Sequence, residues 1–220
     1  MEIGSVRGEV RIEQPTARER TIARRAAEAR ATIPDLELSI DVDIEACLGL
    51  GASITVLLVR ACALALRDVP RANAAYRDGR FELYSRVNVG LTVAAEDAYV
   101  TPTVFDADAK SLAELGVEID ELARKARAGA LSPPELSGAT FTLTDRGEHG
   151  VVSSTAIITP PQAAALAVGG VRDVPVIRNG AVVAGRVLTI TLACDHRILY
   201  GAQAGSFLRR VKTLLEQARL

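Results

Sequence analysis

The chain has 220 residues, about half of them apolar, and a formal net charge of −1. This length supports a single domain with a large buried core, and the near-zero charge argues against general electrostatic binding of nucleic acid. No apolar run is long enough to span a bilayer, and the first residues have neither a basic start nor an apolar signal core, so we expect a cytoplasmic protein without a membrane segment.

In the first half of the chain, helical and extended patterns alternate. Ser53 has the side chain of a helix N-cap, and the segment after it is apolar on nearly all sides, which predicts a buried helix. Asp43 is expected to cap a short helix in the same way, and Asp78-Gly79 marks a turn. In chain order, we expect a surface helix over 18–31 that Pro34 ends, a strand over 36–42, helices over 43–50 and 54–67, a strand over 81–84, and a strand over 87–95 paired with 99–104.

The second half begins with a capping box, Ser111 followed by Glu114, which opens a helix. Small apolar residues over 162–171 are typical of a strand covered on both faces. Asn179-Gly180 between apolar pairs predicts a tight hairpin. In chain order, we expect a helix to residue 127, strands over 139–144 and 162–171, the hairpin, a last strand over 187–194 and a last helix over 202–217.

These elements form one α/β domain, of the mixed or two-layer α+β kind, with a large sheet packed by helices. The sequence has no internal repeat, low-complexity stretch or linker. Cys47, Cys62 and Cys194 are an odd number without metal-like spacing, so we expect buried free thiols in a reducing compartment. There is no glycine-rich phosphate loop, metal-ligand cluster or Ser-His-Asp order.

One of the two histidines, His196, lies where an apolar strand pattern gives way to a helical pattern. A histidine at such a junction is held by backbone on both sides while its ring can face a cleft. Imidazole titrates nearest neutral pH among the side chains, which suits a general base. A backbone-bonded junction histidine without a catalytic role is the alternative.

The segment around this histidine, Asp195-His-Arg-Ile-Leu-Tyr200-Gly-Ala, resembles the "DHRxxDGA" motif of dihydrolipoyl acyltransferase catalytic domains. These domains are the cores of 2-oxo acid dehydrogenase complexes and are related to chloramphenicol acetyltransferase. Five further segments resemble the family in the family's order. They are Arg20 to Arg25 with Thr32-Ile-Pro34, Asp68 to Asn73 with Asp78-Gly79, Tyr99 to Pro102, Ala139 to Gly150, and Ile158 to Ala164.

The resemblance implies a chloramphenicol-acetyltransferase-like fold, a mixed sheet packed by helices, in a homotrimer whose active site lies between subunits. Trimers of the family can build larger cages. Residues 1–14 are expected to be an N-terminal extension, and 15–220 the acyltransferase catalytic domain. No lipoyl or peripheral-subunit-binding domain is expected, because the three lysines lack the context of a lipoyl site.

The family's reaction moves an acyl group between coenzyme A and a dihydrolipoyl thiol. Coenzyme A is then a substrate, no cofactor is bound covalently, and the lipoyl group belongs to a separate domain or protein. Dehydrogenase-complex components are further possible partners. In the family, a Ser or Thr hydroxyl contributed by the neighbouring subunit stabilises the oxyanion, and Thr144 occupies that position. By the same resemblance, His196 is the general base.

Tyr200 departs from the family, which has Asp or Asn four residues after the histidine. That residue orients the site, and an arginine near the first helix, Arg20, Arg24 or Arg25, is its expected partner here. Asp195 and Arg197 are expected to fix the turn and can also pair across the trimer interface. Gly201 is expected to open the last helix where a side chain would clash.

Two other functions remain open on the sequence. The altered Tyr200 and the missing lipoyl domain favour a trimeric or cage-forming scaffold that has lost its chemistry. The altered loop from Asp145 to His149 favours a stand-alone coenzyme A-dependent acyltransferase with a different small-molecule acceptor. His149 itself is predicted to be a solvated loop residue. The acyl group is not specified by the sequence.

Overall fold

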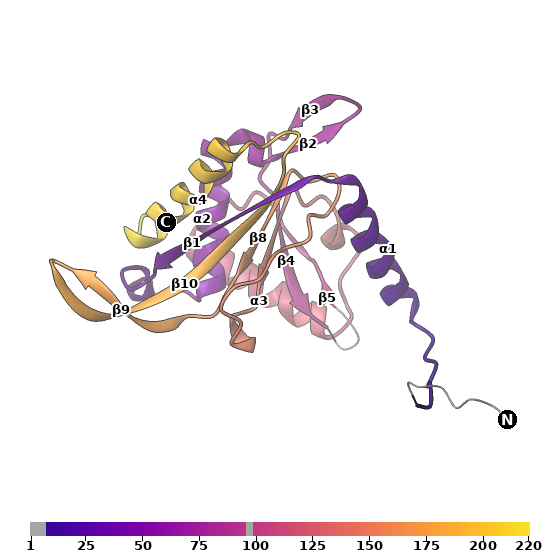
Figure 1. Cartoon of the computed structure of the whole chain (residues 1–220), viewed down its shortest axis with the longest axis horizontal. Coiled ribbons are helices and arrows are strands. Elements are labelled where there is room, and N and C mark those ends of the chain that lie inside the picture. The colour runs from indigo at the N-terminus through magenta and orange to yellow at the C-terminus, as the bar shows by residue number, and fades with distance from the viewer. Residues whose placement is uncertain (1–7, 96–98) are drawn as a thin grey trace.

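The computed structural model describes residues 8–95 and 99–220, which are built around a mixed β-sheet (Figure 1). Its strands are β1 Asp35–Asp43, β4 Val89–Ala94, β5 Tyr99–Val100, β6 Thr103–Val104, β7 Phe141–Asp145, β8 Ala164–Val168, β9 Arg172–Arg178 and β10 Ala181–Asp195. They follow the order β1-β10-β8-β7-β4, with β5 and β6 paired to β4 and β9 paired to β10. The β4–β7 and β7–β8 pairs are parallel and the others antiparallel, so the predicted mixed sheet is confirmed.

The described residues form four α-helices, and these match the predicted segments. Their bounds are α1 Ala17–Thr32, α2 Ile54–Asp68, α3 Leu112–Arg127 and α4 Gly201–Glu216. Ser53 caps α2 by accepting a hydrogen bond from the Val56 N–H, and Ser111 forms the predicted capping box with Glu114. A separate hairpin of β2 (Ala74–Arg77) and β3 (Arg80–Leu83) surrounds the predicted turn.

One face of the sheet is covered by α2, α3 and α4, which pack against each other and against the strands. The helix side of this core includes Leu58, Leu115 and Phe207, and the sheet side includes Phe141 and Leu192, all buried. The helix α2 is buried along most of its length, as its all-round apolar sequence predicts. This layer fixes the ends of β10 and α4, between which the candidate site lies.

The other face of the sheet is covered by the end of α1 and by the chain segment before β8. Ile33, Ala156 and Ile158 pack there against small side chains of the sheet, Ala165 and Ala167. All five residues of β8 are buried, so the strand predicted to be covered on both faces is confirmed, over the shorter range 164–168. Small residues are needed here because an irregular segment lies directly on the strand.

The last strand is longer than predicted. The sequence pattern indicates a short hairpin strand and a separate strand over 187–194, but β10 is one strand of 15 residues. Gly185 and Arg186 interrupt the apolar pattern without interrupting the strand, because here the neighbour is only β9. The pairing of β10 with β1 begins only at Val187 of β10. The β9–β10 hairpin therefore projects beyond the body of the molecule (Figure 1).

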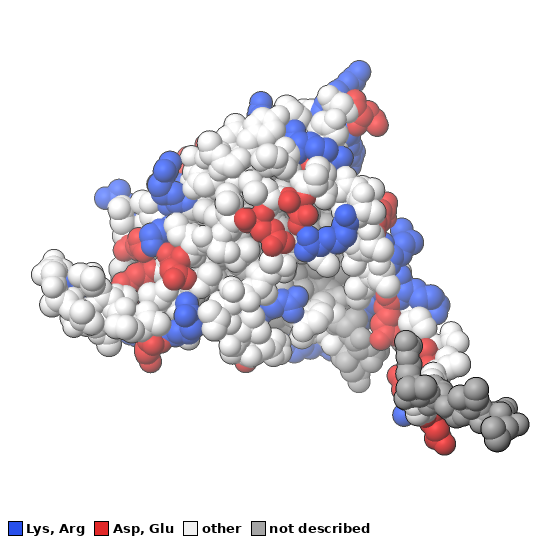
Figure 2. All heavy atoms as spheres, in the orientation of Figure 1, with Lys and Arg blue, Asp and Glu red and all other residues white. Residues whose placement is uncertain are grey.

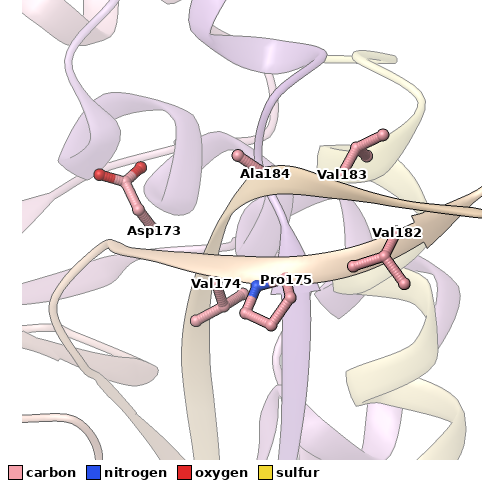
Figure 3. Close-up of a pocket in the computed structure, with 6 residues that line it drawn as sticks. All are labelled: Asp173, Val174, Pro175, Val182, Val183 and Ala184. Carbon is pink, nitrogen blue, oxygen red and sulfur yellow. The ribbon is translucent and has the colours of Figure 1, made fainter.

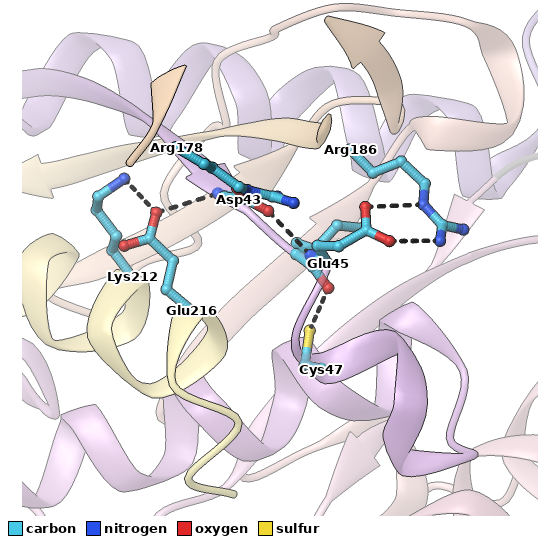
Figure 4. Close-up of polar contacts among 8 residues, drawn as sticks. Asp43, Glu45, Cys47, Arg178, Arg186, Lys212 and Glu216 are labelled. Atoms are coloured by element: carbon cyan, nitrogen blue, oxygen red, sulfur yellow. Dashed lines mark hydrogen bonds and ion pairs between the residues drawn. The ribbon is translucent and has the colours of Figure 1, made fainter. Parts of the chain in front are cut away.

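Ion pairs fasten both strands of this hairpin to the rest of the fold (Figure 4). Arg178 on β9 pairs with Asp43 at 2.5 Å, and Arg186 on β10 pairs with Glu45 at 2.7 Å. Glu216 of α4 accepts a hydrogen bond from the Asp43 N–H at 3.1 Å. The hairpin, the end of β1 and the end of α4 thus meet at one point.

The prediction that Asp43 caps a helix is wrong. Asp43 is the last residue of β1, and its carboxylate accepts a hydrogen bond from the Glu45 N–H in a turn. The helix that follows is a short 3-10 helix, Cys47–Leu50, without a side-chain cap. The paired segments 87–95 and 99–104 are confirmed as β4 with β5 and β6, while their connection at 96–98 lies outside the described residues.

All three cysteines are buried and free, as predicted. None of the helices in the described ranges combines the length and apolar character needed to cross a membrane.

Candidate active site

The predicted junction at His196 is confirmed, because β10 ends at Asp195 and α4 begins at Gly201. The His196 N–H donates to the carbonyl of Pro34 at 2.9 Å, which ties the junction to the end of α1. The side chain is exposed within one chain. The backbone of the candidate base is therefore fixed while its ring stays accessible, as proton transfer requires.

Asp195 and Arg197 fix the turn, as predicted, and do so by pairing with each other. The Asp195 carboxylate accepts a hydrogen bond from the Arg197 N–H at 3.0 Å and pairs with the guanidinium at 2.7 Å. Asp195 is only 2% exposed. The side-chain hydrogen bond between its carboxylate and the guanidinium also raises the pKa of Arg197. The Arg197 guanidinium stacks on the Tyr76 ring of β2, 4.6 Å from its centroid. The turn is thus bound to the β2–β3 hairpin.

Tyr200 lies beside the candidate base. Its ring meets the His196 ring edge-on, with 5.9 Å between centroids, and its hydroxyl is 3.4 Å from the carbonyl oxygen of Arg197. The arginine next to Tyr200 is Arg71, whose guanidinium is 5.8 Å from the ring centroid.

Two of the three candidate arginines of α1 have other partners in the described chain, and none of the three contacts Tyr200 there. Arg20 donates to the Pro15 carbonyl, and Arg24 pairs with Glu28. The expectation that an arginine of α1 serves Tyr200 is thus not met within one chain, and sequence reasoning missed Arg71. The only available signal was that Arg71 falls within a segment resembling the family.

Gly201 is the first residue of α4, as predicted, but the expected clash is absent. A Cβ atom built there would lie 3.8 Å from Leu36 Cδ2, an ordinary van der Waals distance. Its backbone also has no positive φ angle. Within the described chain, neither a close contact nor a positive φ angle therefore requires glycine at this position.

Thr144 lies near the end of β7, as predicted, and is half-buried. Its hydroxyl is 2.9 Å from the hydroxyl of Thr92 on β4, so one of the two donates to the other. The next residue, Asp145, accepts hydrogen bonds from Thr55 at 3.1 Å and from the Gly147 N–H at 2.9 Å. His149, in the same loop, is exposed, which confirms its prediction as a solvated residue.

A single chain does not bring Thr144 and His196 together. Thr144 pairs with Ala167 on β8, and Ala167 pairs with Thr191 on β10. Thr191 precedes His196 by five residues, so the two side chains are about 16 Å apart along the strand direction and two strands apart across the sheet. No single carbonyl group can contact both side chains within one copy.

The neighbouring cysteine, Cys194, is unsuited to nucleophilic chemistry. Burial raises the pKa of its thiol to about 11, and its sulfur donates to the Leu199 carbonyl. A thiol with this pKa is almost fully protonated at neutral pH, and the thiolate is the reactive form. The thiol of Cys194 is therefore not a candidate for the reactive group at the junction.

A hollow of about 400 Å³ lies elsewhere, on the β9–β10 hairpin (Figure 3). Its lining contains no residue of the His196 junction. The lining residues are Asp173, Val174, Pro175, Val182, Val183 and Ala184. The hollow is mostly apolar, and Asp173 is the one titratable side chain among the described residues of its lining.

Residues 8–220 match the family model of the 2-oxoacid dehydrogenases acyltransferase catalytic domain. A relative from Zymomonas mobilis, the dihydrolipoyllysine-residue acetyltransferase component of a pyruvate dehydrogenase complex, is 35% identical over 90% of this chain. The chain spans 48% of that relative's length.

Two solved structures have 28% identity and a TM-score of 0.89, covering 100% of this chain and 96% of theirs. One is a dihydrolipoamide acetyltransferase from Azotobacter vinelandii, investigated for the role of a serine, a histidine and an asparagine in its catalytic mechanism. The other is the cubic core of a pyruvate dehydrogenase multienzyme complex.

A chloramphenicol acetyltransferase resembles the chain with a TM-score of 0.61 at 15% identity, over 91% of this chain and 96% of its own. At this identity the likeness concerns the fold, and it agrees with the fold expected from the sequence. The chain belongs to the family of 2-oxoacid dehydrogenase acyltransferase catalytic domains.

Proposed function

We propose that this chain transfers an acyl group between coenzyme A and a dihydrolipoyl thiol, with His196 as the general base. The observation that carries the proposal is the position of His196, which the backbone fixes at the β10–α4 junction with its side chain exposed. In the Azotobacter enzyme, the serine precedes the histidine by 52 residues and the asparagine follows it by 4. Thr144, His196 and Tyr200 have the same separations, 52 and 4.

The chemistry follows from these side chains. The His196 imidazole accepts the proton of the attacking thiol, which is mostly protonated at neutral pH, as its sulfur bonds to the thioester carbonyl carbon. The Thr144 hydroxyl donates a hydrogen bond to the oxyanion of the tetrahedral intermediate. Collapse of the intermediate breaks the original carbon–sulfur bond. The departing thiolate then takes the proton back from the imidazolium, so each thiol is exchanged for the other.

Thr144 and His196 act together only if they come from two copies, because one chain holds them apart. We therefore include a homotrimer in the proposal, with Thr144 of one copy facing His196 of the next. The β9–β10 hairpin supports an interface between copies. It projects from the body with Ile177 and Val182 exposed by 77% and 72%. Its surface shows few charges in the view of Figure 2.

The proposal extends to the partners. Coenzyme A is a substrate, and the lipoyl group is carried by a separate domain or protein that belongs to a 2-oxo acid dehydrogenase complex. Assembly of trimers into a cage is part of the same proposal, since a cubic core is among the similar structures. The identity of the acyl group is left to the assay.

The test is acyl transfer from acetyl-, succinyl- and isobutyryl-coenzyme A to dihydrolipoamide, comparing the parent chain with His196→Ala. We expect turnover with at least one donor, and a loss of about 10²- to 10⁴-fold in the variant, as for removal of a general base. Because the side chain is exposed, the variant is expected to keep the circular dichroism spectrum and the sedimentation coefficient of the parent.

Three results contradict the proposal. Equal activity of parent and variant removes His196 from the mechanism. A well-folded parent that turns over none of the donors and binds no coenzyme A indicates a scaffold. Turnover of coenzyme A donors with other thiols or amines, but not with dihydrolipoamide, indicates a different acceptor.

A further inference from the structure

We propose that Tyr200 is a positioning residue for the His196 imidazole and that Arg71 holds Tyr200 in that position. The inference rests on the proposed function, because it assigns Tyr200 a role in orienting the base. It departs from the family pattern, in which a carboxylate or amide occupies this place. Here the orienting contact is made by the face and edge of an aromatic ring.

The ring of His196 has little else to orient it within one chain. Its backbone N–H is bound to Pro34, but over residues 8–95 and 99–220 no hydrogen bond to its imidazole nitrogens is found. The edge-on contact with Tyr200 is the aromatic contact that the ring makes. Edge-to-face geometry is a preferred arrangement for two π systems, so this contact favours one ring orientation.

Tyr200 is itself held firmly at its backbone. It is the N-cap residue of α4, and its carbonyl accepts hydrogen bonds from Gln203 and Ala204, both at 2.9 Å. Its side chain does not cap the helix, although Asn or Asp at this position is well suited to do so. The tyrosine thus gives up a capping hydrogen bond, and the contacts that it makes instead are with His196 and Arg71.

Arg71 completes the arrangement from the other side. Its guanidinium lies 4.9 Å from the Phe81 ring centroid and 5.8 Å from that of Tyr200, and it donates to the Ile198 carbonyl at 3.5 Å. It forms no ion pair with a carboxylate of the described residues. Its contacts are therefore aromatic rings and a backbone oxygen, as in cation–π packing.

These contacts connect the β2–β3 hairpin to the candidate base. The contacts form a continuous series in which each residue touches the next: Phe81 of β3, Arg71 before β2, Tyr200 and His196. The hydroxyl of Tyr200 is only at the long limit of a hydrogen bond to the Arg197 carbonyl. The ring of Tyr200, rather than its hydroxyl, therefore positions the imidazole.

The experiment compares Tyr200→Phe, Tyr200→Leu and Arg71→Ala in the full chain. Arg77→Ala, at the end of the β2 strand that follows Arg71 and in an exposed pair with Glu82, is the matched control. Two measurements are made on each variant. The first is kcat and KM for the coenzyme A thioester and dihydrolipoamide. The second is the rate at which diethyl pyrocarbonate modifies His196, read by mass spectrometry. His149, the only other histidine and an exposed one, serves as the internal reference.

We expect Tyr200→Leu to lower kcat about tenfold with KM changed less than about twofold, because a misoriented base affects the transition state more than substrate binding. Arg71→Ala is expected to act in the same direction and less strongly. Tyr200→Phe and Arg77→Ala should stay within about twofold of the parent. The modification rate of His196 relative to that of His149 should rise in Tyr200→Leu. The Arg71→Ala variant can share this rise, and Tyr200→Phe and Arg77→Ala should not show it.

Two outcomes overturn the inference. In the first, Tyr200→Leu leaves both kcat and the modification ratio unchanged. In the second, Tyr200→Phe is as impaired as Tyr200→Leu, which assigns the role to the hydroxyl. If the parent has no acyl transfer activity but the modification ratio changes as expected, the positioning role stands and the proposed function fails. The two conclusions are thus separable.

Discussion

At the scale of single residues, the proposed mechanism assigns oxyanion stabilisation to the hydroxyl of Thr144. Replacing Thr144 by Val removes the hydroxyl and keeps the branched shape, so we expect kcat to fall about 10²- to 10³-fold, as for loss of one oxyanion donor. Thr144→Ser keeps the hydroxyl and should retain most of the activity. Steady-state assays of both variants check this.

The control for that comparison is Thr92→Val, which removes the hydroxyl partner of Thr144 on β4 but leaves the donor itself. It should cost far less activity than Thr144→Val. Equal losses of activity in Thr92→Val and Thr144→Val would instead indicate that the hydroxyl pair stabilises the sheet.

The residues at the junction differ in how far sequence predicts them. His196, Asp195 and Arg197 are contiguous, so a strand pattern followed by a helical pattern is enough to place them at one turn. Arg71 is 129 residues before Tyr200. Their contact depends on how the β2–β3 hairpin packs against the junction, and no local pattern contains that information.

At the scale of elements, the loop after β7 is pressed against two glycines. A Cβ atom on Gly169 would lie 1.9 Å from the Val152 carbonyl oxygen, and the Gly170 N–H donates to Val151 at 2.7 Å. Gly169→Ala must therefore displace the segment 151–152, which follows the strand that carries Thr144. We expect a loss of about 1–3 kcal/mol in the free energy of unfolding, measured by denaturant titration.

Gly116 provides the matched control, because a Cβ atom there has no neighbour within 4 Å. Gly116→Ala lies in α3 and should raise stability slightly, since alanine favours helices over glycine by about 1 kcal/mol. Unchanged stability in Gly169→Ala would mean that the segment 151–152 adapts freely.

The elements themselves follow closely from the sequence where a local signal exists. Ser53 and Ser111 mark helix starts because their hydroxyls cap the chain at those residues, and Asn179-Gly180 marks the hairpin. The Asp43 side chain could accept a capping hydrogen bond just as the serines do, but the residues after it form a turn and a short 3-10 helix. Tertiary packing decides such cases. The sequence pattern divides β10 in two because Gly185 and Arg186 interrupt its apolar residues, while pairing with β9 keeps the strand continuous there.

At the scale of the whole molecule, assembly and chemistry are predicted to depend on each other. Ile177→Asp combined with Val182→Asp places charges on the exposed apolar surface of the β9–β10 hairpin. We expect the parent to sediment at three times 23.3 kDa, or at a multiple of that mass if trimers form a cage, and the double variant at lower mass, with loss of acyl transfer. Val117→Asp, on α3 at 75% exposure, is the control and should leave both unchanged.

A second prediction tests whether the site is shared between copies. His196→Ala and Thr144→Val are each expected to be nearly inactive alone. Unfolded and refolded together, they form mixed assemblies in which an intact His196 faces an intact Thr144 of the other variant. Activity should therefore return in the mixture, to a fraction of the parent's. A mixture as inactive as its components, despite confirmed mixing by mass spectrometry, contradicts the shared site.

The length of β10 has a consequence for how this family member can change over evolution. Side chains of a strand alternate between two faces, so one inserted residue reverses the faces of everything on one side of the insertion. β10 continues without a break from the hairpin tip to Asp195 and is paired along the way with β9, β8 and β1. Insertions in it are tolerated only in even numbers or as bulges. The number of residues between the hairpin tip and His196 can therefore change but is constrained to keep its parity.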